Sequence, residues 1–167
     1  MEENVTTIEA PKKRPSFLTV LCILSFIGSV FLLGASIYQY FTFEKSYPKQ
    51  MEMFTTQLET LSDAGIDSGF TYKSLENGIV TLEKTSQNLG MISGVNILFA
   101  ILSLAGIFLI FKLKKNGFYL YSVANLFWLL VPLVLVDFEA SMMNALIMGF
   151  FTILFIIMYA VNLKHME

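Results

Sequence analysis

The stretch "GIFLIFKLKKNGFYLYS", residues 106–122, decides how this chain folds. An apolar run meets three lysines within four residues, an Asn-Gly pair follows, and a second apolar run begins with aromatic residues. A turn in a soluble helical core and a turn between two membrane spans would both look like this. The composition of the whole chain separates the two alternatives, and its charge pattern assigns the turn to one side of a membrane.

Charged residues are scarce and unevenly placed. They make up 14% of the 167 residues, while 55% are hydrophobic; soluble domains carry roughly 25% charged residues. Segments 15–43, 85–111, 116–136 and 140–163 contain no Asp, Glu, Lys or Arg. Each reaches the ~20 residues that cross ~30 Å of hydrocarbon, and four in succession would leave a soluble bundle no polar face. The sequence therefore predicts an all-α, multi-pass membrane protein, a bundle of four transmembrane helices.

The charges that remain predict the orientation of the spans. Lys and Arg concentrate on the cytoplasmic side of membrane proteins. Here they flank the first span, fill the opening turn and follow the last span: Lys12, Lys13, Arg14, Lys112, Lys114, Lys115 and Lys164. Residues 44–84 hold seven acids against four lysines, and the remaining connection contains Asp137 and Glu139. We expect both termini and the turn that contains Lys112, Lys114 and Lys115 to be cytoplasmic.

These patterns predict an order of segments along the chain. We expect a disordered cytoplasmic tail over 1–15, a span over 16–43, an extracytoplasmic helical hairpin over 44–88 and a second span over 89–111. A cytoplasmic turn over 112–116, a span over 117–136, an outer turn over 137–140, a span over 141–163 and a cytoplasmic tail over 164–167 complete it. We expect Gly117 to take the left-handed geometry that ends helices. A cleaved signal peptide is the alternative for the first span, although signal h-regions are only ~7–15 residues long.

The long acidic connection carries two helical stripes. Apolar residues recur at helical spacing on both sides of Gly65 and Gly69: Met51, Phe54, Leu58 and Leu61, then Leu75, Ile79, Leu82 and Leu89. Neither helix would be stable alone in water, so we expect them to pair, with Pro48 in the first turn of the first and Leu58 facing Leu82. Two helices lying on the lipid headgroups are the alternative.

Groups suited to catalysis are sparse. His165 is the only histidine and lies in the tail, Cys22 is the only cysteine, and the spans contain no ionisable acid or base for a proton relay. We therefore expect no catalytic, cofactor or metal site. Asp137 and Glu139 could bind a cation or act as acid and base, but compensation of a helix N-terminus is the simpler role. A net charge of −2 gives no indication of a nucleic-acid partner.

Polar and small residues within the spans suggest helix contacts. Three amides, Asn96, Asn125 and Asn144, could meet in one polar patch, as an ion or ligand site or as interhelical hydrogen bonds. Small residues at packing positions let helix backbones approach closely. They are Ser25, Ser29, Gly90, Gly94, Ala145 and Gly149, and we expect them to pack within one bundle rather than between chains.

Two stretches carry a family resemblance. Residues 14–34, "RPSFLTVLCILSFIGSVFLLG", and residues 115–121, "KNGFYLY", resemble uncharacterised four-span inner-membrane proteins of Bacteroidetes type. The resemblance implies a bacterial plasma (inner) membrane location and supplies no activity.

Our leading functional hypothesis is a non-enzymatic scaffold or accessory subunit. Embedded in the lipid bilayer, it would engage a membrane or periplasmic protein, or a second copy of itself, through the outer hairpin. The alternative is a small channel or transporter subunit that uses the three-amide patch. A third hypothesis is a lipid-modifying enzyme that uses Asp137 and Glu139.

Overall fold

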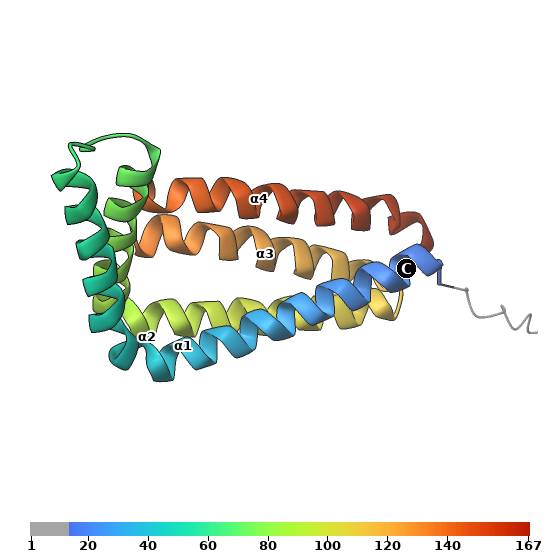
Figure 1. Ribbon diagram of the computed structural model, residues 1–167. Helices are drawn as coiled ribbons and strands as arrows, with labels where there is room; N and C mark the ends of the chain where they lie inside the picture. The colour runs from blue at the N-terminus through green and yellow to red at the C-terminus, as the bar shows by residue number, and fades with distance from the viewer. Residues whose placement is uncertain (1–13) are drawn as a thin grey trace, which may run out of the picture.

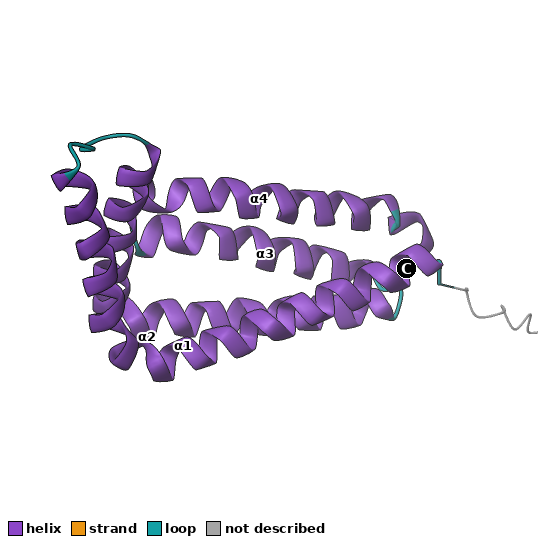
Figure 2. Ribbon diagram, viewed as in Figure 1, coloured by secondary structure: helices purple, strands orange, loops and turns teal. Residues whose placement is uncertain are grey.

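The structure, a computed structural model, describes residues 14–167 and consists of helices joined by short turns (Figure 2). The helices are α1 (Ser16–Asp63), α2 (Phe70–Phe111), α3 (Lys115–Leu135) and α4 (Phe138–Val161), followed by the 3-10 turn η1 (Leu163–His165). All four helices are long and apolar enough to cross a membrane. The all-α prediction is thus confirmed for these residues. The expected tail lies, up to residue 13, outside the described residues.

The helices pack in chain order, α1 on α2, α2 on α3 and α3 on α4 (Figure 1). Contact between α1 and α4 is narrow and lies at the end near the C-terminus, where the Tyr159 hydroxyl donates to the Leu21 carbonyl oxygen (3.1 Å). Toward the other end of the bundle, α1 and α4 diverge (Figure 1). A cleft lined by both helices lies at this diverging end.

Helices α1 and α2 are each much longer than one span, because each continues into one arm of a hairpin. We call residues 44–63 the α1 arm and residues 70–88 the α2 arm. Pro48 lies inside α1 rather than beginning a new helix as expected, and its missing N–H removes one hydrogen bond of that helix. Helix α1 changes direction between its span and its arm (Figure 1). In α2, Asn88 has non-helical angles (φ −121°, ψ 18°) at the point where the arm meets the span.

The two arms lie side by side across one end of the bundle (Figure 1). The loop between them contains Gly65 (φ 74°) and Gly69 (φ 101°), in the left-handed region that favours glycine. The Phe54 ring lies against Gly78, where an added Cβ would be 3.2 Å from the ring. The stripe residues are partly or fully buried, whereas the glutamates of the arms are exposed: Glu44, Glu52, Glu59, Glu76 and Glu83.

The register of the arms differs from the expected one. Because Phe54 opposes Gly78 in an antiparallel pair, Leu82 lies opposite residues that precede Phe54, and not opposite Leu58. The reason is that α1 extends to Asp63 and the connecting loop is short, so the arms pair outward from that loop. The midpoints of the two apolar stripes do not determine the register.

Three basic segments meet at the opposite end of the molecule. The Arg14 guanidinium lies 3.5 Å from the centroid of the Phe111 ring. The Glu167 N–H donates to the Leu113 carbonyl oxygen (2.6 Å), and the Lys115 N–H donates to the Glu167 carbonyl oxygen (2.7 Å). The start of α1, the α2–α3 turn and the C-terminal residues therefore share one end, while the hairpin and the α3–α4 turn share the other (Figure 1).

Several boundaries differ from the predicted ones, for identifiable reasons. Helix α3 begins at Lys115, so the turn is only 112–114, and Leu113 (φ 61°) takes the left-handed conformation expected of Gly117. Helix α4 begins at Phe138 and ends at Val161, so both its ends precede those expected. The predicted tail over 164–167 is packed, because the apolar Met166 side chain is only 2% exposed within the core cluster.

Candidate functional site

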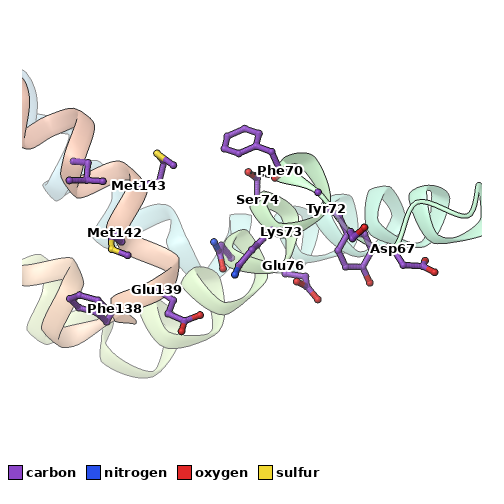
Figure 3. A pocket seen from close by; sticks show the side chains of 14 residues that line it. Asp67, Phe70, Tyr72, Lys73, Ser74, Glu76, Phe138, Glu139, Met142 and Met143 are labelled. Carbon is purple, nitrogen blue, oxygen red and sulfur yellow. Dashed lines mark hydrogen bonds between the residues drawn. The ribbon is translucent and has the colours of Figure 1, made fainter.

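A cleft lies between the hairpin and the first turns of α4 (Figure 3). Its first part has a volume of about 790 Å³ and is lined mainly by the start of the α2 arm and the start of α4. Its second part, about 810 Å³, reaches Tyr38 and Thr42 of α1. Both parts share Ser74, Asn77 and Met143 as lining residues, so they adjoin and form one cleft.

The α3–α4 turn determines how α4 enters this cleft. Asp137 is the N-cap residue of α4, and its Oδ1 accepts a hydrogen bond from the Ala140 N–H (2.9 Å). The Ser141 hydroxyl donates to the Pro132 carbonyl oxygen (3.0 Å), which ties the first turn of α4 to the end of α3. Asp137 therefore has the helix-terminal role, whereas Glu139 is exposed and lines the cleft. The two residues therefore have different environments.

The two sides of the cleft differ in chemistry. The α2 arm presents Lys73, Glu76 and Asn77, with the Ser74 hydroxyl beside them. Figure 3 shows Lys73 reaching from this arm toward the start of α4, where Glu139 lies. In the first part of the cleft, the other α4 side chains are apolar and at least two-fifths exposed: Phe138, Met142, Met143 and Leu146. The α2 arm adds the aromatic Phe70 and Tyr72. A cleft that presents both charged and apolar side chains suits a ligand that is itself amphiphilic.

The cleft opens toward the side of the bundle. Its second part lies between α1 and α4, which diverge here (Figure 1). The rim side chains remain exposed, Tyr38 at 71% and Ile147 at 50%. In a membrane, such an opening between two helices would face lipid, near the end of the spans.

The structure brings together two of the three predicted amides. Asn96 and Asn125 line one small cavity of about 20 Å³, which is enough for about one water molecule. The Asn125 amide donates to the Ser103 hydroxyl (3.1 Å) and to the Tyr121 carbonyl oxygen (2.7 Å). Asn144 is exposed and lines the cleft beneath the hairpin instead. Asn125 thus makes a hydrogen bond between α3 and α2, and Asn96 lines the same small cavity.

The predicted small residues divide into two groups. Ser25, Ser29, Ala145 and Gly149 are buried: the Ser29 and Ser103 hydroxyls lie 3.1 Å apart, and a Cβ on Gly149 would be 3.2 Å from Leu129. Gly90 and Gly94 are exposed, with nothing within 4 Å of an added Cβ, so the prediction that they pack within the bundle is wrong. The buried face of α2 at this level holds Ile92, Ser93 and Ala100 instead.

Sequence reasoning missed two packing features. Tyr159 is fully buried: its hydroxyl lies 2.9 Å from the Ser25 Oγ, and its ring meets the Tyr121 ring edge-on at 5.0 Å. Nothing in the sequence distinguishes Tyr159 from an aromatic residue at the membrane interface. Gly106 and Gly117 form the close contact between α2 and α3. In the sequence, only the presence of these two glycines within residues 106–122 indicates a close helix contact. A glycine beside a turn is equally consistent with a helix end.

Neither a group of metal ligands among the described residues nor a similar known protein indicates a function. Within residues 14–167, no three His, Cys, Asp or Glu side chains are grouped so that they could hold a metal ion. No family model, curated protein or solved structure matches the chain. The resemblance to four-span Bacteroidetes-type proteins therefore stays a prediction, and the geometry of the cleft is the basis for a functional proposal.

Proposed function

We propose that this chain is a non-enzymatic membrane protein that binds an amphiphilic lipid in the cleft beneath its hairpin. The observation that carries the proposal is the cleft itself, which combines charged and polar side chains, most of them from the α2 arm, with apolar side chains, most of them from α4, and reaches between α1 and α4. The proposal includes a bacterial inner-membrane location, with both termini cytoplasmic and the hairpin on the outer side.

The distribution of charge supports this orientation. Arg14 and the lysines of residues 112–115 lie at one end of the molecule, whereas the acidic hairpin and Glu139 lie at the other (Figure 1). Positive flanks favour the cytoplasmic side. The cleft would then lie at the level of the outer leaflet and its headgroups.

The chemistry of the walls supports a zwitterionic phospholipid as the ligand. Lys73 can bind a phosphate, and Glu76 and Glu139 on the same cleft can bind an ammonium group. The exposed methionines of α4 can contact an acyl chain, and methionine side chains adapt to ligands of variable shape. Because the acyl chains of a bilayer lipid are already out of water, close packing and the charged contacts, rather than the hydrophobic effect, would hold the lipid in the cleft.

A protein partner on the hairpin is the second candidate function. Ile66 in the hairpin loop and Phe70 at the start of the α2 arm are exposed, Phe70 at 74%. Exposed apolar side chains at a loop tip are typical of binding surfaces. The channel hypothesis has weaker support, because Asn96 and Asn125 share a cavity of only about 20 Å³.

The test compares two matched methionine variants of α4. Met143 lines both parts of the cleft, whereas Met148 lies further along the same helix, is similarly exposed and does not line it. Native mass spectrometry of the purified protein would measure retained phosphatidylethanolamine. We expect Met143→Trp to fill the cleft and reduce retention at least about fivefold, roughly the effect of 1 kcal/mol, while Met148→Trp retains the wild-type level. Equal retention in both variants, or none in the wild type, would refute the lipid site.

A further inference from the structure

A second groove lies at the basic end of the molecule, far from the cleft. It runs along the contact between α1 and α2 and has a volume of about 300 Å³. Cys22 and Ile107, each 2% exposed, form its floor. Exposed side chains from the same two helices form its walls, Ile23 and Phe26 from α1, and Phe108 and Phe111 from α2. The groove is thus apolar throughout and open along one side.

Two cations are held on the aromatic wall of this groove. The Arg14 guanidinium lies 3.5 Å from the centroid of the Phe111 ring, and the Lys112 Nζ lies 4.4 Å from the centroid of the Phe108 ring. Cation–π contacts of this kind fix the position of a charge over a ring. Both charges therefore lie at the end of the groove where the spans end, which is the level of lipid phosphates in a membrane.

Arg14 also has a hydrogen-bond donor to spare. Its Nε is buried and has no hydrogen-bond partner within residues 14–167. A buried donor without an acceptor is costly, so such groups in native proteins call for an explanation. A rotation of the Arg14 side chain would be needed to bring this N–H to a phosphate oxygen at the mouth of the groove, and the guanidinium charge would pair with the same phosphate.

We infer that this groove binds an anionic phospholipid of the cytoplasmic leaflet. One acyl chain would lie between α1 and α2 over Cys22 and Ile107, and the phosphate would lie between Arg14 and Lys112. Net negative charge distinguishes this ligand from the zwitterionic lipid proposed for the cleft, because both charged groups held on the aromatic wall, Arg14 and Lys112, are cations. The inference rests on the proposed membrane placement but not on the cleft as a lipid site.

The test measures the binding of phosphatidylglycerol and of phosphatidylcholine to the full-length protein by native mass spectrometry. The groove variant combines Arg14→Gln with Lys112→Gln. The matched control combines Lys114→Gln with Lys164→Gln, which removes the same charge at the same end from exposed positions outside the groove. We expect the groove variant to lose at least about tenfold in phosphatidylglycerol affinity, as two basic contacts predict, and the control to stay within about twofold. Phosphatidylcholine binding should barely change in either.

A third variant tests the acyl-chain position without changing charge. Ile23→Trp enlarges a wall side chain and should weaken binding of both lipids by a similar factor. Equal losses in the groove variant and its charge control would mean general attraction to a basic surface and would overturn the inference, as would a wild type without preference for phosphatidylglycerol. Membrane fractionation separates the two proposals: a wild type absent from the membrane refutes both, whereas a membrane-embedded wild type without that preference refutes the groove alone.

Discussion

Two glycines, Gly106 and Gly117, determine how closely α2 approaches α3. A Cβ on Gly106 would lie 2.7 Å from the Tyr121 backbone nitrogen, and a Cβ on Gly117 would lie 2.5 Å from the Ile110 backbone nitrogen. Backbone atoms cannot rotate away as a side chain can, so any larger residue must separate the helices. Small residues have this role between membrane helices in general, because packing replaces the hydrophobic effect there.

This contact predicts opposite effects for two alanine substitutions. We expect Gly117→Ala to reduce the free energy of unfolding by about 1–3 kcal/mol or more, as overpacking does. Gly94→Ala should be neutral or stabilising by up to about 1 kcal/mol, since an added Cβ there meets nothing within 4 Å and alanine favours the helix. Unfolding in mixed detergent, followed by circular dichroism, measures both. A Gly94→Ala variant as unstable as Gly117→Ala would contradict the assigned helix faces.

At the scale of elements, the hairpin is an extension of two spans rather than a separate unit. Both arms continue spans, with Pro48 and Asn88 near the corners, so each arm's direction is coupled to its span. The arms pair with Phe54 opposite Gly78 and cover the end of α4 where the cleft lies. The register of the arms therefore decides which polar residues face the cleft.

Cross-linking measures this register directly. In a double variant with Phe54→Cys and Gly78→Cys, the two introduced cysteines should react efficiently with a short thiol cross-linker, because the two positions are in contact. The pair Leu58→Cys/Leu82→Cys should react poorly, because each residue is displaced by one helical turn in the same chain direction, which separates the positions along antiparallel helices by roughly 12 Å at 1.5 Å per residue. Native Cys22 is buried and does not interfere. Faster reaction of the second pair would establish the alternative register.

At the scale of the whole molecule, charge is separated along the axis of the bundle. The start of α1, the 112–114 turn and the C-terminal residues are held together by the Arg14–Phe111 contact and the hydrogen bonds of Glu167. The acidic arms and the α3–α4 turn lie at the far end (Figure 1). Under the positive-inside rule, this charge pattern favours the proposed orientation, with the basic end of the molecule cytoplasmic.

Single-cysteine labelling in intact cells tests the orientation. Asp67→Cys, in the exposed hairpin loop, should react with a membrane-impermeant maleimide, whereas Lys114→Cys, exposed in the α2–α3 turn, should react only after permeabilisation. Labelling of both variants after solubilisation in detergent is the control, because it shows that each cysteine can react with the maleimide. Labelling of Lys114→Cys in intact cells would contradict the proposed orientation, and labelling of both would contradict a sealed four-span arrangement.

The sequence by itself determined the helical class, the four long apolar helices and the two glycine positions of the hairpin loop. These follow from local properties: uncharged runs of spanning length and glycines that tolerate positive φ. The expected hairpin stripes also reappear as the less exposed faces of the arms, because heptad spacing places their residues on one side of a helix.

Only the tertiary structure decided which faces meet. It buries Gly117 and leaves Gly94 open, places Asn96 and Asn125 but not Asn144 on one small cavity, and forms a cleft from α1, the arms and α4. In a span that is apolar all round, no polar stripe distinguishes the face toward lipid from the face toward protein. Rotation, register and crossing of such helices depend on close contacts between distant residues, and those contacts have no local signature in the sequence.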